Sequence, residues 1–165
     1  MRAWCIRLTV FLATMAGVLT AVTAPANASE TAAANAWKKP QVLVAVLTGG
    51  QEVPGPGDED GRGVFVAKVK GDTLCYALSA RKIETPMAAH IHGAPFGVAG
   101  GIVVGLKSPV GGWSADCITA VPDDQNSQMT LTRSELAAIL AKPADFYVNV
   151  HTASFPAGAV RGQLF

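Results

Sequence analysis

The stretch Val64-Phe65-Val66-Ala67-Lys68-Val69-Lys70, then Gly71-Asp72, then Thr73-Leu74-Cys75-Tyr76-Ala77-Leu78-Ser79 determines the fold class. In each run apolar residues recur at every second position, which is the period of a strand with one buried face. The Gly-Asp pair between the runs is typical of a tight hairpin turn. The stretch therefore predicts two antiparallel strands, with Leu74, Tyr76 and Leu78 on one face of the second.

Short runs of the same kind fill most of the remaining chain. We expect further strands at residues 41–48, 87–92, 102–106, 145–152 and 160–164, and a strand or an ordered loop at residues 113–120. One helix is expected after Thr132, because Thr132 and Glu135 form a capping box and Pro143 ends the apolar stripe of Leu136, Ile139 and Leu140. This spacing predicts an all-β protein, an antiparallel sandwich or barrel of about seven or eight strands with one short helix.

The N-terminal residues 1–28 have the pattern of a secretory signal peptide. Arg2 and Arg7 give the N-terminus a positive charge before an apolar run over residues 8–22, and Ala26-Asn27-Ala28 is a small-x-small cleavage site. The polar, Ala-rich residues 29–39 are expected to form a flexible arm, which leaves residues 40–165 as one domain. The mature chain has no apolar stretch of membrane-spanning length, so we expect it to be secreted to the cell envelope or beyond.

Charge and motifs narrow the function classes. Removing Arg2 and Arg7 from the 13 basic residues leaves 11 against 12 acidic ones, a net charge of −1 for the mature chain. The sequence has no cluster of basic residues that could contact a phosphate backbone, which argues against a nucleic-acid partner. The chain also has no Gly-x-Ser-x-Gly elbow, no His-Glu-x-x-His motif and no close carboxylate pair. The sequence therefore favours a protein without enzymatic activity and leaves that question open.

Cysteine usage fits an oxidising compartment. Cys5 precedes the apolar run and leaves with the leader, so the mature chain keeps Cys75 and Cys117. An even pair on expected strands of an exported protein predicts one disulfide. The alternative is a pair of soft metal ligands, but the two residues lack the close spacing of a Cys-x-x-Cys site.

The three histidines form the sharpest pattern in the chain. His90 and His92 stand two residues apart on an expected strand, so their rings project from the same face, and the apolar residues beside them mark the opposite face as the core. His151 lies on a second alternating run, on the same non-core face as Tyr147 and Asn149. If the two strands are neighbours, three imidazoles meet and can hold copper or zinc.

The structural alternative for these residues is ordinary hydrogen bonding. His90 and His92 would then bond to backbone groups or to Asn149, and His151 would cap the turn beside Thr152. Glu52 and Arg161 are expected to form a structural ion pair that fastens the last strand to the loop after the first.

The motifs together resemble the CHRD domain, the module named from chordin and common in secreted bacterial proteins. The resemblance rests on Leu47-Thr48-Gly49-Gly50-Gln51-Glu52-Val53-Pro54, Ala89-His90-Ile91-His92-Gly93, Tyr147-Val148-Asn149-Val150-His151-Thr152 and Arg161-Gly162-Gln163-Leu164. It implies an immunoglobulin-like or barrel-like β-structure. The His-x-His strand is also similar to the copper-ligand strand of copper/zinc superoxide dismutase, whose full site needs more histidines than the three in this chain.

Two function hypotheses follow. The first is a secreted CHRD-type binding or scaffold module, without assigned catalysis, whose partner is a protein or an envelope component. The second is a copper or zinc protein that uses His90, His92 and His151, for metal handling or redox chemistry. The position of the three ring nitrogens distinguishes them, because convergent rings favour metal and splayed rings exclude it.

Overall fold

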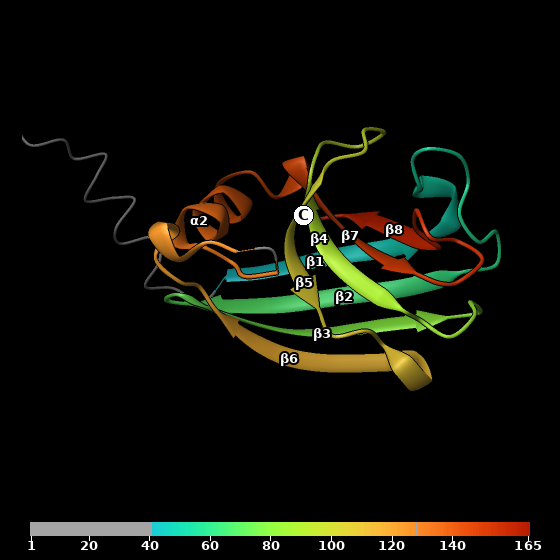
Figure 1. Ribbon diagram of the computed structural model, residues 1–165, viewed down its shortest axis with the longest axis horizontal. Helices are drawn as coiled ribbons and strands as arrows, with labels where there is room; N and C mark the ends of the chain where they lie inside the picture. Colours follow the sequence, from blue (N-terminus) through green and yellow to red (C-terminus); the bar gives the residue numbers. More distant parts are fainter. Residues whose placement is uncertain (1–40, 128) are drawn as a thin grey trace, which may run out of the picture.

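A single sheet accounts for most of the computed structural model, which describes residues 41–127 and 129–165. The predicted leader (residues 1–28) and arm (residues 29–39) lie outside the described residues. The sheet has eight strands in the order β5-β4-β7-β8-β1-β2-β3-β6, and it curls into a nearly closed barrel (Figure 1). The strands are β1 (Gln41–Thr48), β2 (Arg62–Lys70), β3 (Thr73–Arg81), β4 (Ala88–Gly93), β5 (Gly101–Leu106), β6 (Trp113–Thr119), β7 (Phe146–His151) and β8 (Val160–Gln163).

The hairpin predicted from the sequence is confirmed. Strands β2 and β3 pair antiparallel from Lys70–Thr73 at the turn to Arg62–Arg81 at the far end. Phe65 and Tyr76 point inward from the two strands and stack with ring centroids 5.7 Å apart. Full burial of each large apolar side chain contributes about 1.5–3 kcal/mol, so the alternation seen in the sequence is also the main source of stability. The uncertain run at residues 113–120 is a strand, β6.

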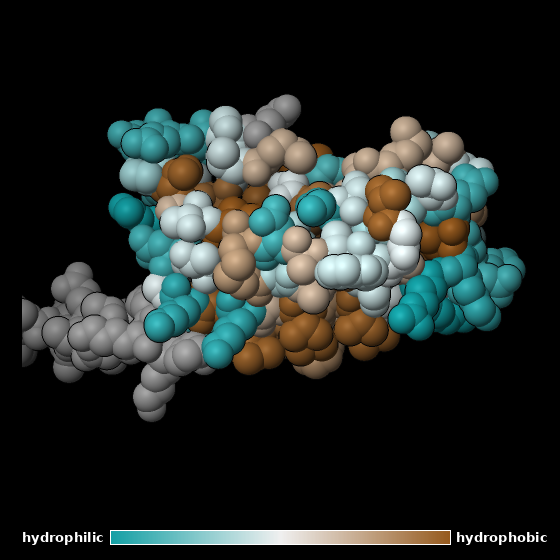
Figure 2. Space-filling model, turned by 90° about the horizontal axis from the view of Figure 1, so that it is seen from below, coloured by the Kyte–Doolittle hydropathy of each residue, from teal (hydrophilic) through white to brown (hydrophobic). Residues whose placement is uncertain are grey.

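The outer surface of β1 and β2 carries an unusual number of apolar side chains. Val42, Val46, Val64 and Val66 are all more than two-fifths exposed, and Val46 lies directly opposite Val64. Seen from below, the surface likewise shows hydrophobic areas next to hydrophilic ones (Figure 2). These valines serve strand formation, since β-branched residues favour the extended backbone.

The helix predicted after Thr132 is α2 (Arg133–Ala141). The Thr132 hydroxyl accepts a hydrogen bond from the Glu135 amide at 3.2 Å, and the Glu135 carboxylate accepts one from the Thr132 amide at 2.8 Å, so the capping box is confirmed. Leu136 and Ile139 of the predicted stripe are buried in the core. Short 3-10 turns complete the structure: η1 (Gly49–Gln51), η2 (Val110–Gly112), η3 (Asp123–Gln125) and η4 (Pro143–Asp145).

The last strand joins the first. Val44 and Phe165 exchange two backbone hydrogen bonds of 3.0 Å, and Thr48 pairs with Arg161. Gly162 permits this approach, because a Cβ at that position would lie 2.4 Å from the Val46 carbonyl oxygen. Strand β8 is thereby held between β7 and β1, which brings the Arg161 side chain up against Tyr147 of β7.

Candidate metal centre

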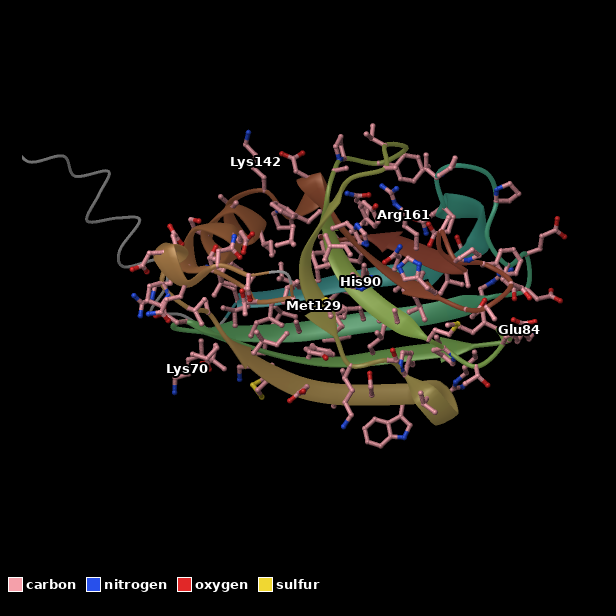
Figure 3. All side chains as sticks on the ribbon, in the orientation of Figure 1. Lys70, Glu84, His90, Met129, Lys142 and Arg161 are labelled. Atoms are coloured by element: carbon pink, nitrogen blue, oxygen red, sulfur yellow. A yellow bond between two sulfur atoms is a disulfide. The ribbon has the colours of Figure 1, made fainter. Side chains whose placement is uncertain are left out.

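All three histidines come together on one wall of the barrel. His90 and His92 lie on β4 and His151 lies on β7, which pairs with β4 in the register Ala88–His151, His90–Asn149 and His92–Tyr147. One ring nitrogen from each residue lies within 4.8 Å of those of the other two. The rings are therefore convergent. Figure 3 shows His90 on the same side of the barrel as Arg161 of β8, far from Lys70 at the other end.

Hydrogen bonds on the outer side of two rings set their tautomers. His92 donates from Nδ1 to the Gly100 carbonyl at 2.9 Å, and His151 donates from Nδ1 to the Pro156 carbonyl at 3.1 Å. Because a carbonyl only accepts, both rings carry the proton on Nδ1, and Nε2 keeps its lone pair. This is the arrangement in which metal-ligating histidines are commonly held, with the distal N–H on a backbone carbonyl.

The inner nitrogens face one another with few donors between them. His90 Nδ1 lies 3.1 Å from His151 Nε2, and Asn149 Oδ1 lies 3.1 Å from the same His151 atom. His92 Nε2 is buried and has no hydrogen-bond partner in the structure. A buried lone pair without a partner costs roughly 1–3 kcal/mol, so the cluster favours a bound cation or donor at its centre.

Burial keeps the rings neutral. Desolvation, together with the neighbouring His151 and His92, lowers the pKa of His90 from 6.5 to about 4. Desolvation is also the main cause that lowers the pKa of His92 and of His151. Metal binding requires unprotonated imidazole, and these three rings meet that condition at neutral pH without competition from protons.

A loop and an arginine hold His92 in place. The return loop between β4 and β5, residues 94–100, supplies the Gly100 carbonyl, and the Gly100 amide donates to the Tyr147 hydroxyl at 3.2 Å. The rings of His92 and Tyr147 stack at 4.8 Å with an interplanar angle of 5°. The Arg161 guanidinium lies 3.5 Å from the Tyr147 ring centroid. His92, Tyr147 and Arg161 therefore form one continuous stack that fixes the orientation of the His92 ring.

Arg161 and Glu52 meet at longer range than a contact ion pair. Arg161 donates to the Val98 and Pro95 carbonyls at 2.9 and 3.1 Å and to Gln163 Oε1 at 3.2 Å. Among the residues that the structure describes, the salt bridge found is the one between Arg133 and Asp72. Glu52 is buried, and desolvation raises its pKa to about 7 against the opposing attraction of Arg161. Arg161 therefore holds the last strand through the backbone carbonyls of Val98 and Pro95, which the sequence pattern did not indicate.

The disulfide lies away from this site. Cys75 and Cys117 face each other across β3 and β6, and their sulfurs are bonded at 2.08 Å. The predicted disulfide is confirmed, and these cysteines are therefore not metal ligands. By joining the strand pair at the edge of the sheet, the bond closes β6 onto β3.

An open pocket adjoins the histidine cluster. It has a volume of about 550 Å³, and its lining consists of Met87, Ala88, His90, Ile102, His151, Thr152, Ala153 and Pro156. Except for the two imidazoles and Thr152, the lining is apolar. The Thr152 hydroxyl is already used, since it accepts a hydrogen bond from the Phe155 amide at 3.3 Å. The pocket gives the cluster access to solvent.

The fold and the site define a disulfide-linked β-barrel module with a convergent histidine cluster on its wall. The family model for the CHRD domain matches residues 43–164, and the chain belongs to this family. No curated protein and no solved structure matches the chain in the two other comparisons. Both the family and the disulfide fit an extracellular location. Within the described residues, no helix has the length and apolar character needed to cross a membrane.

Proposed function

We propose that this CHRD domain is a binding module, and that its ligand is a copper(II) or zinc(II) ion held by His90, His92 and His151. The observation that carries the proposal is the convergence of the three ring nitrogens to within 4.8 Å of one another. Imidazole suits both metals, and three histidines with one further ligand make a complete four-coordinate site.

The distances support this ligand set. Two nitrogens on one zinc ion, each about 2.0–2.1 Å from it, lie about 3.3 Å apart in tetrahedral geometry. His90 Nδ1 and His151 Nε2 are already 3.1 Å apart. His90 then has to carry its proton on Nε2, and the His92 ring has to shift inward from its place on Tyr147, because the ligand nitrogens lie up to 4.8 Å apart. The outer hydrogen bond of His151 Nδ1 to Pro156 leaves its Nε2 available for the metal.

The cluster favours binding over hydrolytic chemistry. Within the described part of the chain, the group that meets metal-ligand spacing consists of three histidines and no carboxylate. A bound metal ion by itself lowers the pKa of its water to about 7, but hydrolysis also uses a nearby acid or base to move protons to and from the substrate. The nearest polar side chains are those of Asn149, an amide whose oxygen lies 3.1 Å from His151 Nε2, and Tyr147, a phenol that accepts a hydrogen bond from the Gly100 amide. We therefore assign the site to metal handling.

The location that we propose is outside the cytoplasm. Residues 1–28 read as a signal peptide with cleavage near Ala28, and the Cys75–Cys117 disulfide is typical of an oxidising compartment. A partner protein or an envelope component that exchanges metal with the site belongs to the same proposal.

The test is metal content and titration of the mature protein, purified from an oxidising compartment. We expect one zinc or copper ion per chain in the wild type and none in the His90→Ala, His92→Ala double variant. The matched control is the Lys68→Ala, Lys70→Ala double variant, which removes two exposed side chains from β2 and should bind as the wild type does. Wild-type binding no stronger than that of the histidine variant would overturn the proposal.

A further inference from the structure

The pocket beside the histidines has a lining that is chemically one-sided. Met87, Ala88, Ile102, Ala153 and Pro156 present hydrocarbon and a thioether, and the polar side chains of the lining are the two proposed metal ligands, His90 and His151, and Thr152. Its volume of about 550 Å³ falls within the range of small-molecule sites, roughly 300–1,000 Å³. A guest of this pocket therefore needs an apolar body.

Charge defines the other end of that guest. Imidazole binds a metal in its neutral form, so three histidines leave the two positive charges of the ion uncompensated, and no acidic side chain lines the pocket. Glu84, which reaches the loop at the edge of the pocket, is occupied by the Ser154 amide and hydroxyl at 3.2 and 2.8 Å. In a site of low polarity an uncompensated cation attracts an anionic ligand.

Coordination number points the same way. Three protein ligands leave one position of a four-coordinate ion open. Two of these ligands, His90 and His151, also form the wall of the pocket, whereas His92 is buried under the return loop. The open position therefore faces the pocket and not the loop.

We propose that the pocket binds a small apolar monocarboxylate, with its carboxylate on the metal and its hydrocarbon part against Met87, Ile102 and Pro156. This inference rests on the proposed metal site. The carboxylate can belong to a free acid or to the C-terminus of an apolar peptide, because both present the same chemistry to the pocket.

The experiment uses the mature protein and begins with the zinc titration described above. Calorimetry then compares acetate, 3-phenylpropionate and an N-acetylated dipeptide ending in phenylalanine, each with the zinc-loaded protein. We expect 3-phenylpropionate to bind about tenfold or more tightly than acetate, because it buries a phenyl group in addition to the carboxylate. If the peptide binds more tightly than the free acid, the source is a chain terminus, and the reverse order indicates a free acid.

Two controls separate this inference from the proposal on which it rests. Ala153→Trp fills the pocket from an exposed loop position and leaves the histidines in place, so it should keep zinc binding and lose the preference for 3-phenylpropionate. Zinc binding with equal affinity for acetate and 3-phenylpropionate overturns the pocket ligand and leaves the metal site intact. Absence of zinc binding overturns both. Equal binding of 3-phenylpropionate to the metal-free protein overturns the role of the metal.

Discussion

Two polar clusters lie side by side on the wall formed by β4, β7 and β8, and their hydrogen-bond chemistry is opposite. Around Arg161, side-chain donors face carbonyl and amide oxygens of the return loop and of Gln163. Around His92 and His151, the donors point outward and the lone pairs point inward. One cluster pairs donors with acceptors, and the other directs the lone pairs of His92 Nε2 and His151 Nε2 toward its centre, where His90 Nδ1 is the one ring donor.

The difference teaches how to tell a structural polar cluster from one prepared for a ligand. Arg161 is fully buried; its Nη1 and Nη2 donate to three protein oxygens, and its Nε is left without a partner. His92 Nε2 is also buried without a partner, but it carries a lone pair that lies near the lone pair of His151, and a metal ion can bind to both. The four predictions below test this contrast, from the largest expected effect to the smallest.

Replacing Arg161 by alanine should cost the most stability. The change leaves the Val98 and Pro95 carbonyls without their donors and removes the cation from the Tyr147 ring, which together should lower the free energy of unfolding by roughly 3 kcal/mol or more. Urea denaturation measures it. Arg133→Ala is the control, because its salt bridge with Asp72 is exposed and should contribute about 0–1 kcal/mol. Equal losses in the two variants would contradict the structural role of Arg161.

Metal should stabilise the wild type and leave the His90→Ala, His92→Ala variant unchanged. An ion that binds only the folded state at 100 times its Kd adds about 2.7 kcal/mol to the free energy of unfolding. Thermal melts with increasing zinc, with and without a chelator, measure the shift. Without metal the same variant should be less stable than the wild type, because it loses the His92–Gly100 hydrogen bond and the stack of His92 on Tyr147. The test is therefore the shift that zinc causes in each protein, and an equal zinc shift in the two proteins would contradict the prediction.

Acid should act on the two clusters with opposite signs. The folded-state pKa of His90 is lowered from 6.5 to about 4, so its contribution is present above pH 6.5 and is lost as pH falls toward 4. The pKa of Glu52 is raised from 4.5 to about 7, so stability is greatest below pH 4.5 and is lost as pH rises to 7.

Variants separate the two signs. Between pH 7 and 4.5 the His90→Ala, His92→Ala variant should gain stability on acidification, by at most about 1.4 kcal/mol per pH unit for the single proton on Glu52. Over the same range Glu52→Gln should lose stability more steeply than the wild type, because the histidine effect is then unopposed. Urea denaturation across this range gives the three curves, and parallel curves would refute the assignment.

The smallest effect is expected for Tyr147→Phe. The change removes the hydroxyl that accepts a hydrogen bond from the Gly100 amide at 3.2 Å and keeps the ring between His92 and Arg161. We expect a loss of about 1 kcal/mol in the free energy of unfolding and an unchanged zinc affinity. A tenfold loss of zinc affinity would show that the hydroxyl belongs to the metal site, and would contradict the separation of the arginine cluster from the histidine cluster.

Periodicity and turn chemistry were enough to predict most of the fold. The hairpin of β2 and β3, the capping box of α2 and the disulfide all depend on residues close in sequence or on a simple pairing rule. The side of the strand on which the histidines lie followed from the same alternation. What alternation cannot give is which strands are neighbours, and that decides whether His151 meets His90.

The backbone groups at the site were beyond sequence reasoning. The carbonyls of Gly100 and Pro156 set the histidine tautomers, and those of Pro95 and Val98 bind Arg161, yet a carbonyl is present at every residue and leaves no mark in the sequence. The expectation of a direct Glu52–Arg161 pair came from opposite charges in two terminal motifs. The available signal was the glycine-rich return loop, in which a Cβ at Gly100 would collide with the Gly93 carbonyl and Ala94.

The pairing of β8 with β1 has a consequence for the order of events in folding. Strand β1 cannot complete its pairing until β8 is in place, since the Val44–Phe165 hydrogen bonds and the Thr48–Arg161 pair join residues more than a hundred positions apart. Contacts of such separation form slowly, because the whole intervening chain must first be ordered. Strand β1 is made early and keeps an unpaired edge until β8 arrives, with valines exposed along it. Until β8 pairs with it, β1 therefore presents an unpaired strand edge that can pair with other chains. A chaperone that shields extended apolar segments would act on the protein at this stage.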